Sequence, residues 1–293
     1  MYSRFQALEK YDLEKLQNST AAVLGLGATG SVIAEHLARH GINLILIDRD
    51  FLEINDLYSS NIYSKNQCVE TLPKAKAAEE KLDDLTEIEA HVENLDSASI
   101  DLLQNVDIVL DGTDNLETRL LIDEYCSNND IPWIYTAALG ERGFSMFVKD
   151  NCFRCSFETL NPSSSCETNG VMREIASITA SKSSMKAVKY LSGLNLNQKL
   201  EMVPSGKTFE LGGCSCEGRT EVSVSSVCGE NKYQVFGGKR PQEFNGKVLA
   251  SNDYLKKIEF NGSELTVFNS GRAIVMASSK EDAENLYREA SSI

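Results

Sequence analysis

Positive charge is scarce in this sequence of 293 residues, in which 29 lysines and arginines face 43 aspartates and glutamates. The formal net charge is therefore −14, and the sequence pI is about 4.8. A protein that binds nucleic acid without regard to base sequence needs a basic face, and no cluster of lysines and arginines along the chain supplies one. We therefore expect no nucleic-acid partner.

Long apolar runs are also missing. The first residues, MYSRFQALEKYDLEKL, lack the apolar core of a signal peptide, and no stretch reaches the roughly 18 uncharged apolar residues that a membrane span needs. We expect a cytoplasmic protein without a membrane partner. Eight cysteines in such a chain indicate thiols, metal ligands or a nucleophile rather than the disulfide framework of a secreted protein.

The first two-thirds of the chain alternate between apolar runs and helical patterns. AAVLGL and NLILID predict buried strands on either side of a helix in SVIAEHLARHG, and the alternation continues to about residue 149. This order predicts an α/β fold, in which a Rossmann-like, doubly wound and mostly parallel sheet carries helices on both faces.

The last third has a different pattern. A turn-rich loop over 161–170 precedes a predicted helix over 171–191, and two glycine-containing turns separate alternating strands near the C-terminus. The run SKEDAENLYREA predicts a final helix, with Ser278 or Ser279 as its cap. These patterns predict three units: a domain over 1–196 that includes the loop near 156–170, a connecting segment over 197–240, and a small antiparallel α+β domain over 241–293.

A glycine-rich turn follows the first predicted strand. Gly25 permits a tight turn, Gly27 lets the backbone approach a phosphate, and Gly30 lets the next helix pack close to the strand. The helix then offers free N–H groups to an anion, and Asp48, after the second strand, is placed to accept hydrogen bonds from ribose hydroxyls. These residues predict a nucleotide site, but they do not separate NAD from ATP.

Three further segments distinguish an ATP site from an NAD site. DRDFLEINDLYSSNIYS, LPKAKAAEE and VLDGTDNLETR follow one another at the ends of successive predicted strands, and a dehydrogenase gives no reason for the second and third. With these segments the chain, from Tyr2 to about Leu191, resembles the ThiF/MoeB/HesA family, relatives of the ubiquitin-activating enzymes. The resemblance implies an adenylyltransferase that uses ATP. An NAD(P)-linked oxidoreductase is the alternative that the glycines and Asp48 support.

The resemblance also implies roles for individual residues. Asp48 would hold the ATP ribose, Lys74 would lie against the phosphates, and Asp114 would bind Mg²⁺. Arg119 would support this site from the following helix. Taken alone, Lys74 is explained as a solvated lysine at a helix start, and Asp114 as a helix cap or turn residue. Arg4, in YSRF, matches an arginine that reaches into the partner's ATP site in the family's homodimers, so a homodimer is implied.

Two pairs of cysteines lie in the second half of the chain. Cys152 and Cys155 form a C-x-x-C pair, and Cys214 and Cys216 form a second pair. Four thiolates suit a closed tetrahedral zinc site, against the alternatives of free buried thiols or a redox pair. The resemblance implies that this structural zinc pins the connecting segment to the main domain. Because the second pair is one residue shorter than C-x-x-C, Cys228 is the alternative to Cys216.

Cys166 lies in the turn-rich loop, outside both pairs. A thiolate near a helix N-terminus has a lowered pKa and is a competent nucleophile. Relatives carry a cysteine here, which in some bonds covalently to the activated partner protein and in others is dispensable, so both roles stay open. Cys68 and Cys126 are expected to be ordinary helix or core thiols.

One segment departs from the family pattern, S-N-L-x-R-Q. NDLYSSN places Asp56 where asparagine is usual, and Ser59 where the family has an arginine that neutralises charge around the α-phosphate. Loss of such an arginine costs several orders of magnitude in rate unless another cation replaces it. The candidate replacements are Arg49, Lys65 and Arg142.

The predicted function is ATP- and Mg²⁺-dependent adenylation of the C-terminal carboxylate of a small ubiquitin-like or sulfur-carrier protein that ends in Gly-Gly. The acyl-adenylate would then pass to a sulfur nucleophile, for which Cys166 is the candidate. A non-catalytic paralogue that binds ATP or a partner is the alternative that Ser59 supports. A relative that activates a carboxylate on tRNA is disfavoured by the acidic net charge.

Overall fold

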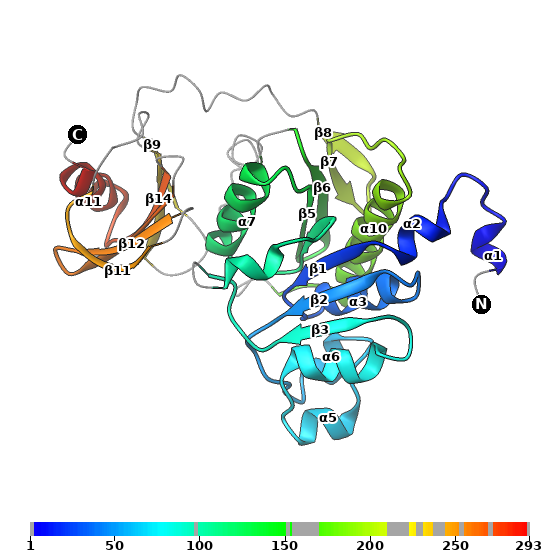
Figure 1. Cartoon of the computed structure of the whole chain (residues 1–293). Helices are drawn as coiled ribbons and strands as arrows, with labels where there is room; N and C mark the ends of the chain where they lie inside the picture. The colour runs from blue at the N-terminus through cyan, green and yellow to red at the C-terminus, as the bar shows by residue number, and fades with distance from the viewer. Residues whose placement is uncertain are drawn as a thin grey trace.

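A computed structural model describes residues 3–96, 99–150, 153, 170–209, 223–226, 231–236, 244–251, 255–268 and 272–291. These residues form a main sheet of eight strands and a second sheet of six (Figure 1). Within the described ranges, no helix is both long and apolar enough to cross a membrane.

The main sheet is mostly parallel at its centre, as the alternating pattern predicts. Its strands are β1 (Thr20–Leu24), β2 (Asn43–Ile47), β3 (Ile88–His91), β4 (Ile108–Asp111), β5 (Trp133–Leu139), β6 (Arg142–Val148), β7 (Leu200–Val203) and β8 (Lys207–Phe209). They lie in the order β3-β2-β1-β4-β5-β6-β7-β8. The first five run parallel to one another, and β6, β7 and β8 extend the sheet as antiparallel strands.

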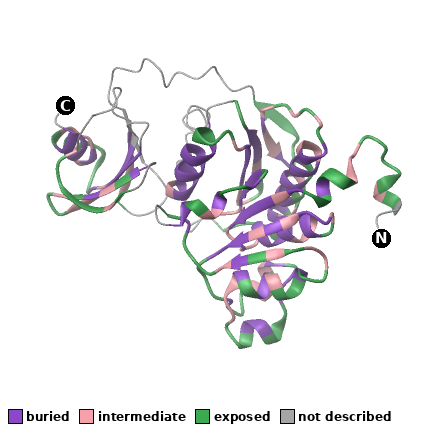
Figure 2. Cartoon of the chain, in the orientation of Figure 1, coloured by how far each residue is buried: buried purple, intermediate pink, exposed green. Residues whose placement is uncertain are grey.

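The central strands are buried on both faces, because alternate residues serve different core clusters. Val23 of β1 belongs to the cluster with α3 (Gly30–Ala38), α6 (Lys74–Leu82) and α10 (Arg173–Leu191). Its neighbours Ala22 and Leu24 belong to the cluster on the other face, with α7 (Leu116–Asn128) and the 3-10 helix η1 (Ile100–Leu103). Burial of both faces explains why AAVLGL and NLILID are continuous apolar runs. Figure 2 shows the buried strands and the buried sides of the helices.

Among the described residues, four short helices lie outside the alternating pattern: α1 (Ser3–Gln6), α2 (Leu13–Gln17), α4 (Asp56–Ser59) and α5 (Lys65–Val69). α1 projects from the main body, at the end opposite to the carboxyl ends of the parallel strands (Figure 1). Phe5 holds it there, since its ring lies 5.1 Å from the Tyr11 ring and 4.6 Å from the His40 ring, centroid to centroid.

The second sheet is antiparallel. It consists of β9 (Ser223–Ser226), β10 (Lys232–Phe236), β11 (Lys247–Ser251), β12 (Leu255–Phe260), β13 (Ser263–Phe268) and β14 (Arg272–Met276), and the helix α11 (Lys280–Ser291) follows it. β9 and β10 precede residue 241, where the small domain was expected to begin, so the connecting segment supplies strands to both sheets. Ser279 caps α11, because its Oγ accepts a hydrogen bond from the backbone N–H of Asp282 at 3.1 Å.

The second sheet packs between α11 and α7. Ala283, Leu286, Tyr287 and Ala290 form the buried stripe of α11, with the spacing that an amphipathic helix requires. On the other side, three apolar residues of the sheet join the core cluster that contains α7: Leu255, Phe268 and Ile274. Thr266 Oγ1 also donates a hydrogen bond to Oε1 of Glu117, on α7, at 3.1 Å. The two sheets therefore meet through α7.

Candidate functional site

A cavity of about 370 Å³ opens at the carboxyl ends of the parallel strands. Its walls come from the segments that follow β1, β2, β3 and β4, from β5, and from Gly170 and Val171 before α10. The strand order reverses between β1 and β4, and in open α/β sheets ligands bind at this position because the loops diverge there. The cavity is therefore the leading candidate for the predicted nucleotide site.

The glycines bring three backbone segments into close contact beside the cavity. Gly25 has φ +75°, and a Cβ there would lie 2.9 Å from the carbonyl oxygen of Gly112. A Cβ on Gly30 would lie 1.7 Å from the carbonyl oxygen of Gly25, so the first turn of α3 can pack here only without a side chain. Gly27 has open space around it. Gly25 and Gly27 line the cavity, whereas Gly30 lies behind them.

Asp48 connects the glycine turn to the end of β2. Its Oδ2 accepts a hydrogen bond from the backbone N–H of Leu26 at 2.5 Å, and its Oδ1 accepts one from Asp50 at 2.7 Å. Burial raises the pKa of this carboxyl, and the two N–H groups offset part of that rise. Each carboxylate oxygen can accept two hydrogen bonds, so Asp48 retains the capacity to accept from ribose hydroxyls.

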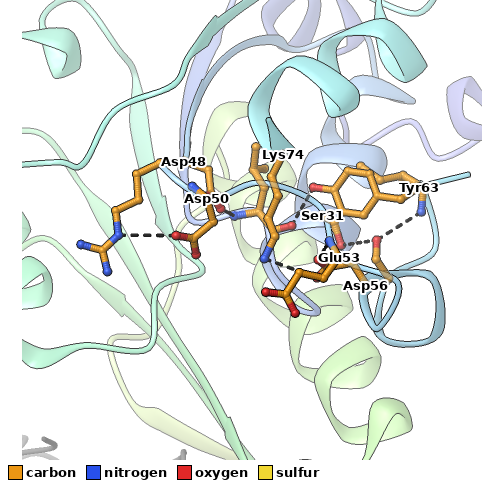
Figure 3. Close-up of polar contacts among 11 residues, drawn as sticks. Ser31, Asp48, Asp50, Glu53, Asp56, Tyr63 and Lys74 are labelled. Atoms are coloured by element: carbon orange, nitrogen blue, oxygen red, sulfur yellow. Dashed lines mark hydrogen bonds and ion pairs between the residues drawn. The ribbon is translucent and has the colours of Figure 1, made fainter. Parts of the chain in front are cut away.

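The segment after β2 is tied to the glycine turn by two contacts that sequence reasoning missed. The hydroxyl of Tyr63 donates to the carbonyl oxygen of Leu26 at 2.7 Å, and Ser60 Oγ donates to Ser31 Oγ, on α3, at 3.0 Å (Figure 3). Burial raises the pKa of Tyr63 far above its usual value, so this hydroxyl stays protonated and able to donate. A tyrosine within a polar stretch is the only signal that the sequence gives.

Lys74 is not a solvated lysine at a helix start. It begins α6 and lines the cavity, yet only 14% of its side chain is exposed. Its Nζ lies 3.3 Å from Oδ1 of Asp56, whose own side chain is 13% exposed (Figure 3). The structure therefore places Lys74 at the cavity but pairs its ammonium group with a carboxylate.

Asp114 is exposed at the wall of the cavity. It does not cap α7, because Asn115 fills that position and its Oδ1 accepts a hydrogen bond from the backbone N–H of Thr118 at 2.8 Å. The alternative interpretation of Asp114 as a helix cap is therefore wrong, because Asn115 is the cap. At the cavity wall Asp114 supplies a carboxylate, the kind of oxygen ligand that suits Mg²⁺.

Arg119 reaches from α7 back to the end of β4. Its Nε donates to Oδ2 of Asp111 at 2.8 Å, and one of its terminal nitrogens donates to the carbonyl oxygen of Thr113. The guanidinium carbon lies 5.0 Å from the centre of the Tyr135 ring. Asp111 is completely buried, so Arg119 supplies the positive charge that this carboxylate needs.

Arg119→Met is expected to lower the free energy of unfolding by about 3 kcal/mol or more, because it leaves the Asp111 charge buried without its cation. Urea denaturation would measure the loss. Arg39→Met is the matched control: its side chain is 61% exposed and pairs with Glu35, so we expect a loss of about 0.5 kcal/mol or less. Equal losses in the two variants would contradict the role of Arg119 as a buried counter-ion.

Comparison with known proteins decides the family. The model of the ThiF family matches residues 2–249. The chain belongs to the ThiF family. The sulfur carrier protein ThiS adenylyltransferase of Bacillus subtilis (strain 168) is 26% identical, over 89% of this chain and 89% of its own length. The Escherichia coli (strain K12) protein of the same name is 27% identical, over 78% of this chain and 94% of its own length.

A solved structure shares the fold. The crystal structure of E. coli MccB with ATP has a TM-score of 0.59 and is 18% identical, covering 74% of this chain and 68% of the MccB chain. At this identity the likeness concerns the fold, and the mostly parallel α/β sheet is the part that it supports. The match of the family model over residues 2–249 confirms the predicted resemblance to the ThiF family.

Neither Asp56 nor Ser59, the two residues at which this ThiF-family chain departs from the family pattern, lines the cavity. Ser59 is half-buried at the end of α4 and does not line the cavity. Of the candidate replacements for the missing arginine, Arg49 lines the cavity, whereas Lys65 and Arg142 are exposed elsewhere. Arg4 is exposed on α1, away from the cavity of its own chain (Figure 1).

Most of the cysteine predictions lie outside the described residues. These are the four expected zinc ligands Cys152, Cys155, Cys214 and Cys216, the alternative Cys228, and Cys166. In the ranges that the structure describes, no group of three or more histidine, cysteine, aspartate or glutamate side chains could hold a metal ion. Cys68 and Cys126 are buried free thiols, which confirms their expected role.

Proposed function

We propose that this protein is an ATP-dependent adenylyltransferase that activates the C-terminal carboxylate of a small sulfur-carrier or ubiquitin-like protein ending in Gly-Gly. One observation carries the proposal: a single cavity is lined by the glycine turn, Asp48 and Asp114, which follow three different strands, and by Lys74 at the start of α6. Membership of the ThiF family and the names of the two adenylyltransferase relatives give the reaction class. They also set aside the oxidoreductase alternative.

The chain's own residues would position the nucleotide. The backbone N–H groups of Gly27 and of the residues that lead into α3 would bind the phosphates, because those of Gly25 and Leu26 already donate within the protein. Asp48 would accept hydrogen bonds from the ribose. Asp114 would hold Mg²⁺ together with phosphate oxygens, and the ion would supply charge neutralisation. Lys74 would stabilise the negative charge that develops as pyrophosphate departs.

The chemical step joins two anions. An oxygen of the carrier's C-terminal carboxylate attacks the α-phosphorus of ATP, a new carboxyl–phosphate bond forms, and the bond to the β-phosphate oxygen breaks to release pyrophosphate. The enzyme contributes by holding both groups in line and by offsetting their repulsion. The acyl-adenylate is then open to attack by a sulfur nucleophile.

Three further elements of the proposal rest on the family pattern. Cys166 is the candidate nucleophile for the acyl-adenylate. Cys152, Cys155, Cys214 and Cys216 would hold a structural zinc, with Cys228 as the alternative to Cys216. Arg4 would reach the ATP site of a second copy in a homodimer, and the position of α1 at the far end from its own cavity supports this arrangement (Figure 1).

ATP–pyrophosphate exchange tests the proposal. The purified protein would be incubated with Mg²⁺, ATP and labelled pyrophosphate, alone and with each of a panel of small β-grasp proteins that end in Gly-Gly. We expect exchange with at least one panel member and none without a carrier or with a carrier that lacks the last two glycines. Binding of ATP without exchange for any member would favour the non-catalytic alternative that Ser59 supports, and Ser59→Arg would then be the next variant.

A further inference from the structure

Within the described residues, every cation that lines the cavity already has an acidic partner. Arg119 is paired with the buried carboxylate of Asp111, as described above. Arg49 pairs with Asp50 at 3.5 Å, but with 66% of its side chain exposed the contact is weak. Lys74 is different, because it is largely buried, lies at the cavity wall and is paired with Asp56.

Asp56 is held firmly in its place behind Lys74. Its Oδ2 accepts a hydrogen bond from the backbone N–H of Glu53 at 2.9 Å, while its Oδ1 faces Lys74. The backbone N–H of Lys74 donates to the carbonyl oxygen of Asp50 at 2.9 Å, which fixes the start of α6 beside this loop (Figure 3). Asp56 itself does not line the cavity. Asp56 therefore offsets the charge of Lys74 from a position outside the lining of the cavity.

We propose that Asp56 sets the nucleotide affinity and phosphate selectivity of this chain by competing with the phosphates of ATP for Lys74. The inference rests on the proposed function, since it takes the cavity to be the ATP site. When a triphosphate enters, the ammonium group must exchange a carboxylate for phosphate oxygens, and the negative charge of Asp56 stays nearby. Because little water screens this pair, both effects weaken the binding of highly charged nucleotides.

The substitution Asp56→Asn removes the negative charge of Asp56 and changes little else. The amide oxygen of asparagine can still accept the hydrogen bond from Glu53, and the side chain keeps its size, so the loop is expected to stay in place. By titration calorimetry with Mg²⁺, we expect ATP to bind about tenfold more tightly to the variant than to the wild type. AMP carries less charge, so its affinity should change by about twofold or less.

Two controls separate competition for Lys74 from other effects. Glu53→Gln removes one negative charge from the same loop at an exposed position, and should leave the ATP affinity within about twofold. In a Lys74→Gln background, Asp56→Asn should tighten ATP binding by much less than about tenfold, since the competition is gone. Asp56→Ser, which keeps a hydroxyl acceptor, replaces Asp56→Asn if circular dichroism shows the latter to be unfolded.

The outcomes distinguish this inference from the proposed function. Tighter ATP binding with a raised ratio of ATP to AMP affinity supports competition. Equal tightening of ATP and AMP, the same gain without Lys74, or no gain at all would overturn it while leaving the adenylation proposal intact. If the wild type binds no ATP, then the nucleotide site and this inference are both wrong.

Discussion

Asp114→Ala is expected to lower the rate of carrier-dependent ATP–pyrophosphate exchange by at least about a thousandfold. The carboxylate belongs to an exposed residue at the wall of the cavity, and Asn115 rather than Asp114 caps α7. Its removal would take away the anchor for Mg²⁺, and the charge on the departing pyrophosphate would lose much of its neutralisation. The exchange assay measures the loss directly.

The same substitution should leave the fold intact. Asn115 keeps the cap of α7, so we expect the melting temperature to change by no more than about 2 °C. Asp84→Ala is the matched control, because this aspartate is exposed after α6 and does not line the cavity; it should retain full exchange activity. An active Asp114→Ala protein would remove Asp114 from the metal site.

Gly30→Ala is expected to disrupt folding. The new methyl carbon would lie 1.7 Å from the carbonyl oxygen of Gly25, and this neighbour is backbone that Gly112 confines from the other side. The clash can be relieved only by moving α3 away from β1 and β4, which should cost several kcal/mol and leave the protein largely unfolded or aggregated. Circular dichroism and the yield of soluble protein would show the loss.

Gly27→Ala is the control that separates folding from binding. A Cβ at this position has nothing within 4 Å, so the variant should fold with nearly wild-type stability. Because Gly27 lines the cavity, the added methyl group would keep a phosphate from the backbone, and ATP affinity should fall about tenfold or more. If the Gly30→Ala protein had normal stability, α3 could not pack against the glycine turn as closely as the structure shows.

The sequence predicts the glycine turn and its surroundings well, because local patterns determine them. β1 is a continuous apolar run, α3 begins at the third glycine, and β2 ends one residue before Asp48, so each element is visible without knowledge of its partners. The same holds for α7, which starts one residue after a typical capping residue, Asn115. In this part of the fold, local propensity and tertiary packing agree.

Pairings between distant residues could not be predicted in this way. β10 pairs with β14, some forty residues later in the chain. Nothing in the sequence of β10 indicates that it pairs with β14 rather than with a strand of the main sheet. The ion pairs are a similar case. Lys74 and Asp56 both carry recognisable charge, but their pairing depends on how the loop after β2 folds back beside α6. The same loop carries Tyr63 to the carbonyl oxygen of Leu26.

The contact between the second sheet and α7 has a consequence for how the protein unfolds. Leu255, Phe268 and Ile274 belong to the same apolar cluster as residues of α7 and β4, in addition to the core that the second sheet forms with α11. Loss of the second sheet would expose this cluster to water, and loss of α7 would remove the surface on which the second sheet rests. We therefore expect the two sheets to unfold together, with the C-terminal strands helping to hold the helix that follows Asp114.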